Sequence, residues 1–205
     1  MLNKEQLIKD AEKKYQSLTF RDDFLFCKIL TNNPDIAKDL IEMILNKKIK
    51  KVVPQKQFSI EITSESRGVR LDVYLDDTEE TVYDLEMQTT SKKELPKRMR
   101  YYQGMIDLNL IERGANFSEL KKSYIIFICT SDPYKMGKYY YSFENLCTEN
   151  PNLSLGDETY KIILNTSGTK NDVSENLQEF CNLINSGTGK TDLCKRINDE
   201  VQKSK

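Results

Sequence analysis

The chain has 205 residues, with 31 Lys or Arg, 32 Asp or Glu and a formal net charge of −1. This length suits one domain with a substantial hydrophobic core, and the near-neutral charge means that any nucleic-acid contact requires locally concentrated positive charge. The absence of histidine excludes Ser-His-Asp and Cys-His nucleophile systems and histidine-bound zinc.

The remaining chemistry must rely on carboxylate, Lys, Tyr or metal-bound water. The available metal ligands are mainly oxygen atoms, which favours Mg²⁺ or Mn²⁺. No apolar run approaches the ~20 residues that cross a bilayer, and the N-terminus lacks the apolar segment of a signal peptide. Five scattered cysteines without a CxxC pair predict free thiols. We therefore expect a cytoplasmic protein that does not bind membranes.

The first part of the chain is predicted to be helical. Residues 2–16 show weak helical spacing with mixed charge. Thr19 is the expected N-cap of a short helix that carries Asp23 in its first turn. A second helix is predicted from Pro34 onward, because apolar residues then recur at helical spacing as far as Leu45.

The middle of the chain changes to the alternation that is typical of strands. We predict strands at 58–62, 70–75 and 82–88, followed by a long helix over 91–113 that ends near Gly114.

A continuous apolar run at 124–130 predicts a strand that is covered on both faces. Strands at 139–143 and 159–164 then precede a helix at 176–184 and a weakly helical, charged tail. This order predicts an α/β or α+β domain with a mixed central sheet between helices. The expected organisation is a helical extension, a single domain and a tail, at 1–18, 19–186 and 187–205.

The strands at 70–75 and 82–88 form a predicted hairpin in which acidic residues interrupt apolar segments. If Glu79 sits in the middle of the turn, Asp72 lies opposite Glu86, with the two Cβ atoms ~5 Å apart. Two such anions repel each other unless one is protonated or a cation lies between them. A bound divalent metal resolves the repulsion most simply, and the alternative is a solvated end of the sheet.

The letters R-L-D-V-Y-L, a spacer and then E-M-Q resemble the core of the PD-(D/E)xK nuclease superfamily. More narrowly, they resemble the Rpn-type recombination-promoting nucleases among the PD-(D/E)xK nuclease family transposases. The stretches DDFLFCKIL, LPKRMRYYQGMIDL and SYIIFICTSDP also fit that pattern, so the resemblance covers about residues 19 to 184. It implies a restriction-endonuclease-like core and a metal-dependent endonuclease that hydrolyses DNA phosphodiester bonds.

The resemblance also implies roles for individual residues. Asp72 and Glu86 correspond to the metal-binding carboxylates, and the main-chain carbonyl of Met87 is a further candidate ligand. Gln88 stands where the superfamily has Lys, as is common in this family, and its amide is expected to orient the attacking water. Asp23 matches an early acidic position that completes the metal shell. Its alternative role is to complement the helix dipole.

The helix after the hairpin is expected to contact DNA. Arg and Lys bind phosphate, and Tyr packs on sugars or bases. The alternative is a solvated basic face with half-buried tyrosines. The candidate DNA-binding residues are Lys97, Arg98, Tyr101, Tyr102 and Gln103.

Two rival functions stay open at this point. The first is a catalytically inactive nuclease fold that serves as a DNA-binding or protein-interaction module. The second is a two-carboxylate glycosidase, which the absence of Trp for sugar stacking disfavours. A homo-oligomer is a further expectation. Family members often continue beyond this point, so the charged tail is a candidate site of truncation. The resemblance implies a role in recombination or in defence against phage, and the word transposase in the family description does not by itself establish the mechanism.

Overall fold

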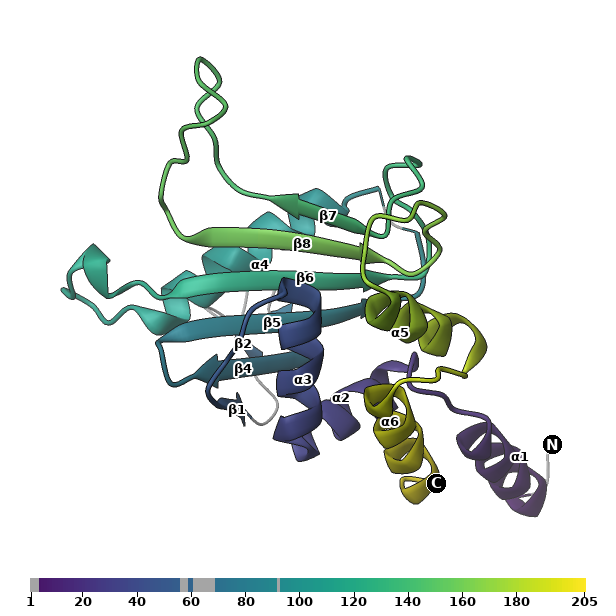
Figure 1. The fold of residues 1–205 in the computed structure, drawn as a ribbon. Helices are drawn as coiled ribbons and strands as arrows, with labels where there is room; N and C mark the ends of the chain where they lie inside the picture. Colours follow the sequence, from purple (N-terminus) through teal and green to yellow (C-terminus); the bar gives the residue numbers. More distant parts are fainter. Residues whose placement is uncertain (1–3, 56–58, 61–68, 92) are drawn as a thin grey trace.

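The structure is a computed structural model that describes residues 4–55, 59–60, 69–91 and 93–205 (Figure 1). Its elements in chain order are α1 (Lys4–Gln16), α2 (Asp23–Asn32), α3 (Pro34–Leu45), β1 (Val52–Gln55), β2 (Ser59–Ile60), β3 (Val69–Arg70), β4 (Val73–Asp77), β5 (Thr81–Gln88), α4 (Leu95–Leu110), the 3-10 helix η1 (Phe117–Glu119), β6 (Lys122–Cys129), β7 (Tyr140–Phe143), β8 (Thr159–Asn165), α5 (Glu175–Ser186) and α6 (Asp192–Lys203).

Six strands form one mixed sheet in the order β1-β4-β5-β6-β8-β7. β5, β6 and β8 are parallel to one another, and the other neighbouring pairs are antiparallel. β2 and β3 form a separate two-stranded sheet. The predicted mixed α/β architecture, with a central sheet flanked by helices, is confirmed.

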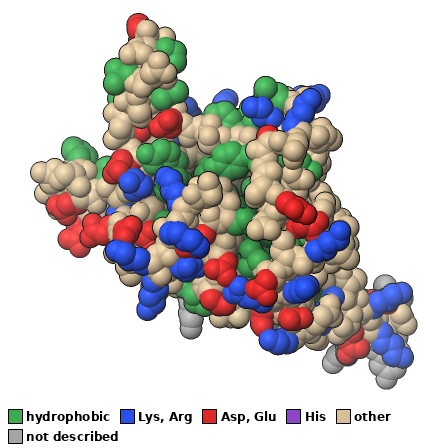
Figure 2. Space-filling view, viewed as in Figure 1, with side chains coloured by type: hydrophobic (Ala, Val, Ile, Leu, Met, Phe, Trp, Pro, Cys, Tyr) green, Lys and Arg blue, Asp and Glu red, His purple; other side chains and the backbone are tan. Residues whose placement is uncertain are grey.

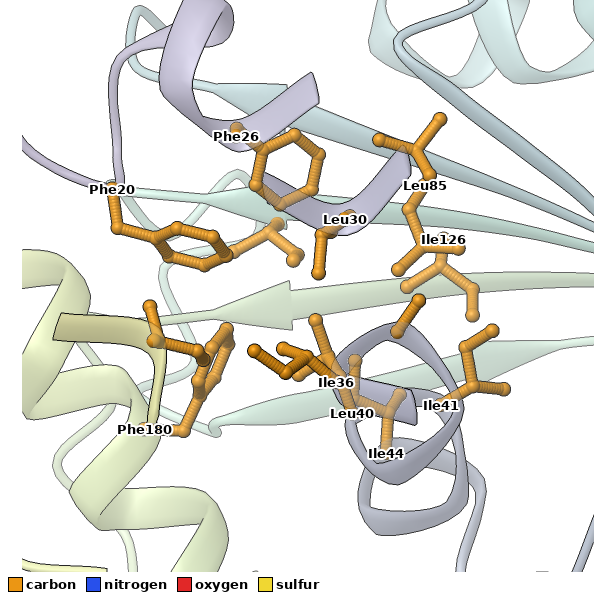
Figure 3. Packing of buried hydrophobic residues seen from close by; sticks show 14 of the residues in the cluster. Phe20, Phe26, Leu30, Ile36, Leu40, Ile41, Ile44, Leu85, Ile126 and Phe180 are labelled. Carbon is orange, nitrogen blue, oxygen red and sulfur yellow. The ribbon is translucent and has the colours of Figure 1, made fainter. Parts of the chain in front are cut away.

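The helices cover the two faces of the sheet unequally. α2, α3, α5 and α6 lie on the face toward the viewer in Figure 1, and α4 lies behind. β5 is buried along its whole length because both of its faces are covered. Figure 3 shows the front core, where Phe26 and Leu30 of α2 and Phe180 of α5 meet Leu85 and Ile126 of the sheet. Each fully buried side chain of this kind contributes about 1.5–3 kcal/mol.

The last helix differs from the prediction. The expected weakly helical tail is a regular helix, α6, which buries four apolar side chains in the main core: Leu193, Cys194, Ile197 and Val201. The side chain of Thr191 caps its first turn by accepting a hydrogen bond from the main-chain N–H of Cys194 at 3.3 Å. α6 therefore packs as part of the same hydrophobic core as α2, α3 and α5.

Two strand predictions were incomplete. The four-residue strand β1 was not predicted, because it contains Pro54 and follows a run of lysines. It lies at the edge of the sheet, where Pro is tolerated. The predicted strand over 70–75 is interrupted, because Arg70 pairs with β2 and β4 begins only at Val73. For the predicted strand at 58–62, Phe58 and residues 61–62 lie outside the described residues.

Two smaller differences concern the ends of helices. Asp22 rather than Thr19 is the N-cap of α2, and its carboxylate accepts hydrogen bonds from the N–H and hydroxyl of Thr19 at 2.7 and 3.0 Å. α4 ends at Leu110 with Ile111 as its C-cap, so the left-handed Gly114 lies in the following loop. Neither of these differences alters which strands pair in the main sheet.

One row of tyrosines crosses three adjacent parallel strands. Tyr83, Tyr124 and Tyr160 are register partners on β5, β6 and β8. Their rings stack with centroids 5.6 and 4.8 Å apart and interplanar angles of 11° and 16°. Lys47, just after α3, donates to the Tyr124 hydroxyl at 3.0 Å and lies over that ring.

Among the described residues, no helix combines the length and apolarity that a membrane crossing requires.

Candidate metal and nuclease site

The hairpin of β4 and β5 brings the predicted carboxylates together. Val73 pairs with Leu85, and the same register places Asp72 opposite Glu86, as predicted. The main-chain N–H of Asp72 donates to Glu86 Oε1 at 2.9 Å. In return, the N–H of Met87 donates to Asp72 Oδ2 at 3.1 Å. Asp72 therefore ends the regular ladder, because its N–H bonds to a side chain of the facing strand.

The turn of this hairpin is fixed by Asp77. Its carboxylate accepts hydrogen bonds from the N–H groups of Glu79 and Thr81 at 2.7 and 2.9 Å. It also accepts a bond from the Tyr83 hydroxyl at 2.8 Å. Glu80 adopts a left-handed conformation with φ 59°. These contacts hold the two strands in the register that makes Asp72 and Glu86 neighbours.

The two carboxyl groups are poorly solvated and repel each other. Burial raises the pKa of Asp72 to about 6, an effect that the hydrogen bond from Met87 opposes and the charge of Asp23 reinforces. Burial, followed by the charges of Asp84 and Asp72, raises the pKa of Glu86 well above its ordinary value. A nearby cation would favour the ionised form of both groups.

Arg98 of α4 brings a positive charge to the same face of β5. Its Nη1 donates to Gln88 Oε1 at 2.5 Å, and its Nη2 lies 3.6 Å from Glu86 Oε2. Nη2 also donates to the Tyr102 hydroxyl at 2.9 Å. The guanidinium lies 5.2 Å from the centre of the Phe127 ring, which helps to fix its orientation. The site thus has a guanidinium beside Gln88, the position at which the superfamily has Lys.

Gln88 is held at both ends of its amide. While Oε1 accepts from Arg98, Nε2 donates to the main-chain oxygen and the hydroxyl of Thr90 at 2.6 and 3.1 Å. The side chain is only 8% exposed. Its amide oxygen has a second lone pair, and this leaves one acceptor position on Gln88 for a further donor such as water.

Asp84 is a third carboxylate on this face and was not among the predicted site residues. Its side chain is 1% exposed, and neither carboxylate oxygen has a hydrogen-bond partner among the described residues. Burial, followed by the charge of Asp72, raises its pKa well above the ordinary value. Alternation along the strand could have identified Asp84 from the sequence, because Asp84 and Glu86 point to the same side of β5.

The other predicted site residues fall into different environments. Asp23 lies at the exposed start of α2, close enough for its charge to raise the pKa of Asp72. Lys97 and Tyr101 are exposed on α4. Gln103 is buried, donates to Asp107 at 2.9 Å and accepts a bond from the hydroxyl of Ser123 at 3.0 Å. These internal contacts do not fit the predicted role of Gln103 in binding DNA.

The chemistry of the site fits an oxygen-preferring divalent cation. The buried carboxylates of Asp84 and Glu86 lie near the guanidinium of Arg98, and the charges of Arg70 and Arg98 both act on Asp72. The carboxylate of Asp84 has no hydrogen-bond partner in the part of the chain that the structure describes. Within the described residues, no group of three or more Asp, Glu or Cys side chains is arranged to hold a metal ion. The donors that this site offers to such an ion are therefore the carboxylates of Asp72 and Glu86, supplemented by main-chain oxygen and water.

A separate surface cavity does not share these residues. It has a volume of about 730 Å³ and lies among α3, α5 and α6. Its Arg196 is already paired with Asp35, Asp39 and Asp192 at 2.6, 2.5 and 3.6 Å. The helix starts beside it are capped by Ser174 and Thr191. The hairpin, rather than this cavity, is the chemically distinctive site.

Comparison with known proteins agrees with this geometry. The description of the family whose model matches is "PD-(D/E)XK nuclease family transposase", and the match covers residues 20–180. No curated protein and no solved structure matches the chain significantly. The matched segment contains the hairpin, α4 and all six strands of the main sheet. The chain therefore belongs to the PD-(D/E)XK nuclease family transposases.

Proposed function

We propose that this protein is a metal-dependent endonuclease that hydrolyses DNA phosphodiester bonds. The observation that carries the proposal is the reciprocal pairing of Asp72 with the Glu86–Met87 segment beside the Arg98–Gln88 contact. Membership of a nuclease family supplies the reaction class. The buried carboxylates and the adjacent guanidinium supply chemical groups that such a reaction requires.

Each group has a proposed task. Asp72 and Glu86 would hold Mg²⁺ or Mn²⁺, together with the main-chain carbonyl of Met87, and the exposed Asp23 would assist from α2. A bound ion of this kind lowers the pKa of a water molecule and neutralises charge on the phosphate. Gln88 orients the attacking water through the free lone pair of its amide oxygen. Arg98 stabilises the negative charge that builds up on the phosphate.

We extend the proposal to the exposed side chains of α4. Lys97 lies one residue before Arg98 and faces solvent, as does Tyr101 one turn later. Lys97 would bind a flanking phosphate, and Tyr101 would pack against the sugar of the same strand. Tyr102 takes a supporting role, because its hydroxyl accepts a hydrogen bond from Arg98.

The proposed setting follows from the chain's chemistry. All five cysteines are free thiols, which supports the proposal of a reducing, cytoplasmic location. The family name supports a role in DNA transposition or recombination, and phage defence is a further proposed role. A homo-oligomer stays a prediction.

Plasmid cleavage by the purified protein tests the proposed activity. We expect nicked and linear DNA with Mg²⁺ or Mn²⁺ and no cleavage in EDTA. Asp72→Asn removes one carboxylate charge at nearly constant shape, so cleavage should fall at least ~10²-fold if that charge serves catalysis. Asp199→Asn, which makes the same change at an exposed position on α6, should cleave like the wild type.

Two outcomes would overturn parts of this proposal. Cleavage that survives Asp72→Asn would show that the site is elsewhere. Failure to cleave any plasmid across a wide range of both metals would favour the rival function of an inactive nuclease fold that binds DNA or protein.

A further inference from the structure

Two loops continue the candidate site along the end of the sheet. Residues 130–138 follow β6 and residues 166–172 follow β8, and we call these two segments the end loops. Thr130 donates its N–H to the Gln88 carbonyl at 3.0 Å, and Thr166 donates to the Cys129 carbonyl at 2.8 Å. The Gly137 carbonyl accepts bonds from the N–H groups of Thr169 and Lys170 at 2.8 and 3.0 Å. The end loops are therefore one surface that begins beside Gln88.

The first end loop is held in shape by Asp132. Its carboxylate accepts hydrogen bonds from the N–H groups of Tyr134 and Gly137 at 2.9 and 2.7 Å, and from the Tyr141 hydroxyl at 3.0 Å. Gly137 is left-handed with φ 73°, and a Cβ there would lie 2.8 Å from Thr169 Oγ1. Only glycine allows the two end loops to pack this closely.

Three lysines of the end loops face solvent. Lys135, Lys138 and Lys170 are exposed, and none of them forms an ion pair with the described part of the chain. The nearby carboxylates are directed elsewhere: Asp132 accepts the bonds above, and Asp172 accepts a bond from the Tyr139 N–H at 3.1 Å. The positive charges on these loops are thus available to an external anion.

The opposite end of the sheet has the opposite character. The connection between β7 and β8, residues 144–158, projects from that end (Figure 1) and carries four acidic residues and no Lys or Arg. Lys121 and Lys122 nearby are paired with Asp76 and Glu158 at 3.8 and 2.8 Å. Figure 2 shows acidic side chains at the left and basic side chains gathered at the upper right, over the end loops.

We propose that Lys135, Lys138 and Lys170 form a phosphate-binding surface that receives the backbone of the DNA beside the cleaved bond. This inference rests on the proposed function. β8 lies two strands from β5, about 10 Å away, and the rise along one DNA strand is about 3.4 Å per nucleotide. The end loops therefore contact phosphates roughly three nucleotides from the bond that is cut. The acidic end of the molecule repels the same polyanion and so favours this orientation.

The test is DNA binding as a function of salt. A fluorescent 30-base-pair duplex is titrated with full-length protein in EDTA, from 50 to 200 mM KCl, for the wild type and for Lys135→Gln/Lys138→Gln/Lys170→Gln. Each lost phosphate contact lowers the slope of log K against log[salt] by about 0.9. We expect the triple variant to lose 2 to 3 in slope and to bind at least ~10-fold more weakly at 150 mM.

A matched variant controls for net charge. Lys9→Gln/Lys51→Gln/Lys195→Gln removes three exposed lysines from other parts of the surface, and its slope should fall by less than 1. Cleavage provides an independent readout, because the end-loop variant should raise KM and leave kcat at saturating DNA unchanged.

Two results separate this inference from the proposed function. Wild-type cleavage together with unchanged binding by the end-loop variant would overturn the phosphate-binding surface alone. A wild type that neither binds nor cleaves duplex DNA would overturn both.

Discussion

The buried carboxylate of Asp84 lowers the stability of the folded protein. The carboxylate is buried without a hydrogen-bond partner among the described residues, on the same face of β5 as Glu86. A buried polar group without partners is energetically costly, and neighbouring carboxylates add repulsion. An acid in such a place is expected where a cation bound to neighbouring carboxylates favours its ionised form.

Replacement of this residue should stabilise the metal-free protein. Asp84→Asn removes the ionisable group at nearly constant volume, together with its repulsion toward Asp72 and Glu86. We expect the free energy of unfolding in EDTA at pH 8 to rise by about 1–2 kcal/mol. Urea denaturation measures the change. Asp132→Asn is the control, because that carboxylate is fully hydrogen-bonded and its loss should destabilise by about 1–3 kcal/mol. Destabilisation by Asp84→Asn would contradict the interpretation.

Asp72 should make stability depend on pH in a particular direction. Burial, the largest effect, raises its pKa from 3.8 to about 6, so the folded state keeps a proton that the unfolded chain releases. The stability contribution of this group is therefore complete below about pH 4 and is lost as the pH rises through 6.

The variant Asp72→Asn isolates this effect. In EDTA, the Tm of the variant relative to the wild type should increase from pH 4 to pH 7. Excess Mn²⁺ at pH 7 should raise the Tm of the wild type more than the Tm of the variant, because only the folded wild type has the complete site. A difference in Tm that stays constant from pH 4 to pH 7 would refute the expected titration.

At the scale of elements, the site depends on how α4 packs against β5. Arg98 is the link, since it contacts both Gln88 and Glu86 and lies over the ring of Phe127. Lys has neither the planar fork nor the stacking surface of Arg. We expect Arg98→Lys to lower the rate of plasmid cleavage at least ~10-fold with an unchanged circular dichroism spectrum.

The same helix offers a matched control. Arg100 is exposed, two residues after Arg98, so Arg100→Lys makes the same chemical change away from β5 and should cleave at nearly the wild-type rate. Equal rates for the two variants would show that the fork of Arg98 has no role in the reaction.

The strands and the carboxylate pair could be predicted because their signal is local. Alternation along 70–75 and 82–88, together with a turn centred on Glu79, was enough to place Asp72 opposite Glu86. The contact between Arg98 and Gln88 could not be predicted from spacing alone, because it depends on how α4 crosses the sheet. β1 was not predicted because it is a short edge strand that contains Pro54.

The C-terminal helix was a different kind of omission. The four buried residues of α6 follow helical spacing, so a signal was present in the sequence. The surrounding charges made that segment look like a solvated tail, although those charges lie on the outer face of an amphipathic helix.

At the scale of the whole molecule, the net charge of −1 results from positive and negative side chains that are unevenly distributed over the surface. Basic side chains gather over the loops after β6 and β8, whereas at the far end of the sheet acidic side chains lie beside lysines with which they pair (Figure 2). Net charge alone would therefore mislead about nucleic-acid binding, because the field near a surface follows the local arrangement of charges.

Neutralisation of the acidic projection between β7 and β8 tests this view. The variant Glu144→Gln/Glu149→Gln/Asp157→Asn removes three of the four negative charges of residues 144–158 and leaves the ion pair between Lys122 and Glu158 in place. We expect the affinity for duplex DNA at 50 mM KCl to stay equal or to rise, as measured by fluorescence anisotropy. Weaker binding by the variant would mean that the projection itself contacts DNA.

The stacked tyrosines have a practical consequence for spectroscopy. The chain has no Trp and 11 Tyr, so its near-ultraviolet absorption comes mainly from Tyr. Tyr83, Tyr124 and Tyr160 hold parallel rings across the three parallel strands. Their excitonic coupling should give a near-ultraviolet dichroism band that reports the register of β5, β6 and β8. The protein thus contains a label-free optical probe of how β5, which carries Glu86, packs against β6 and β8.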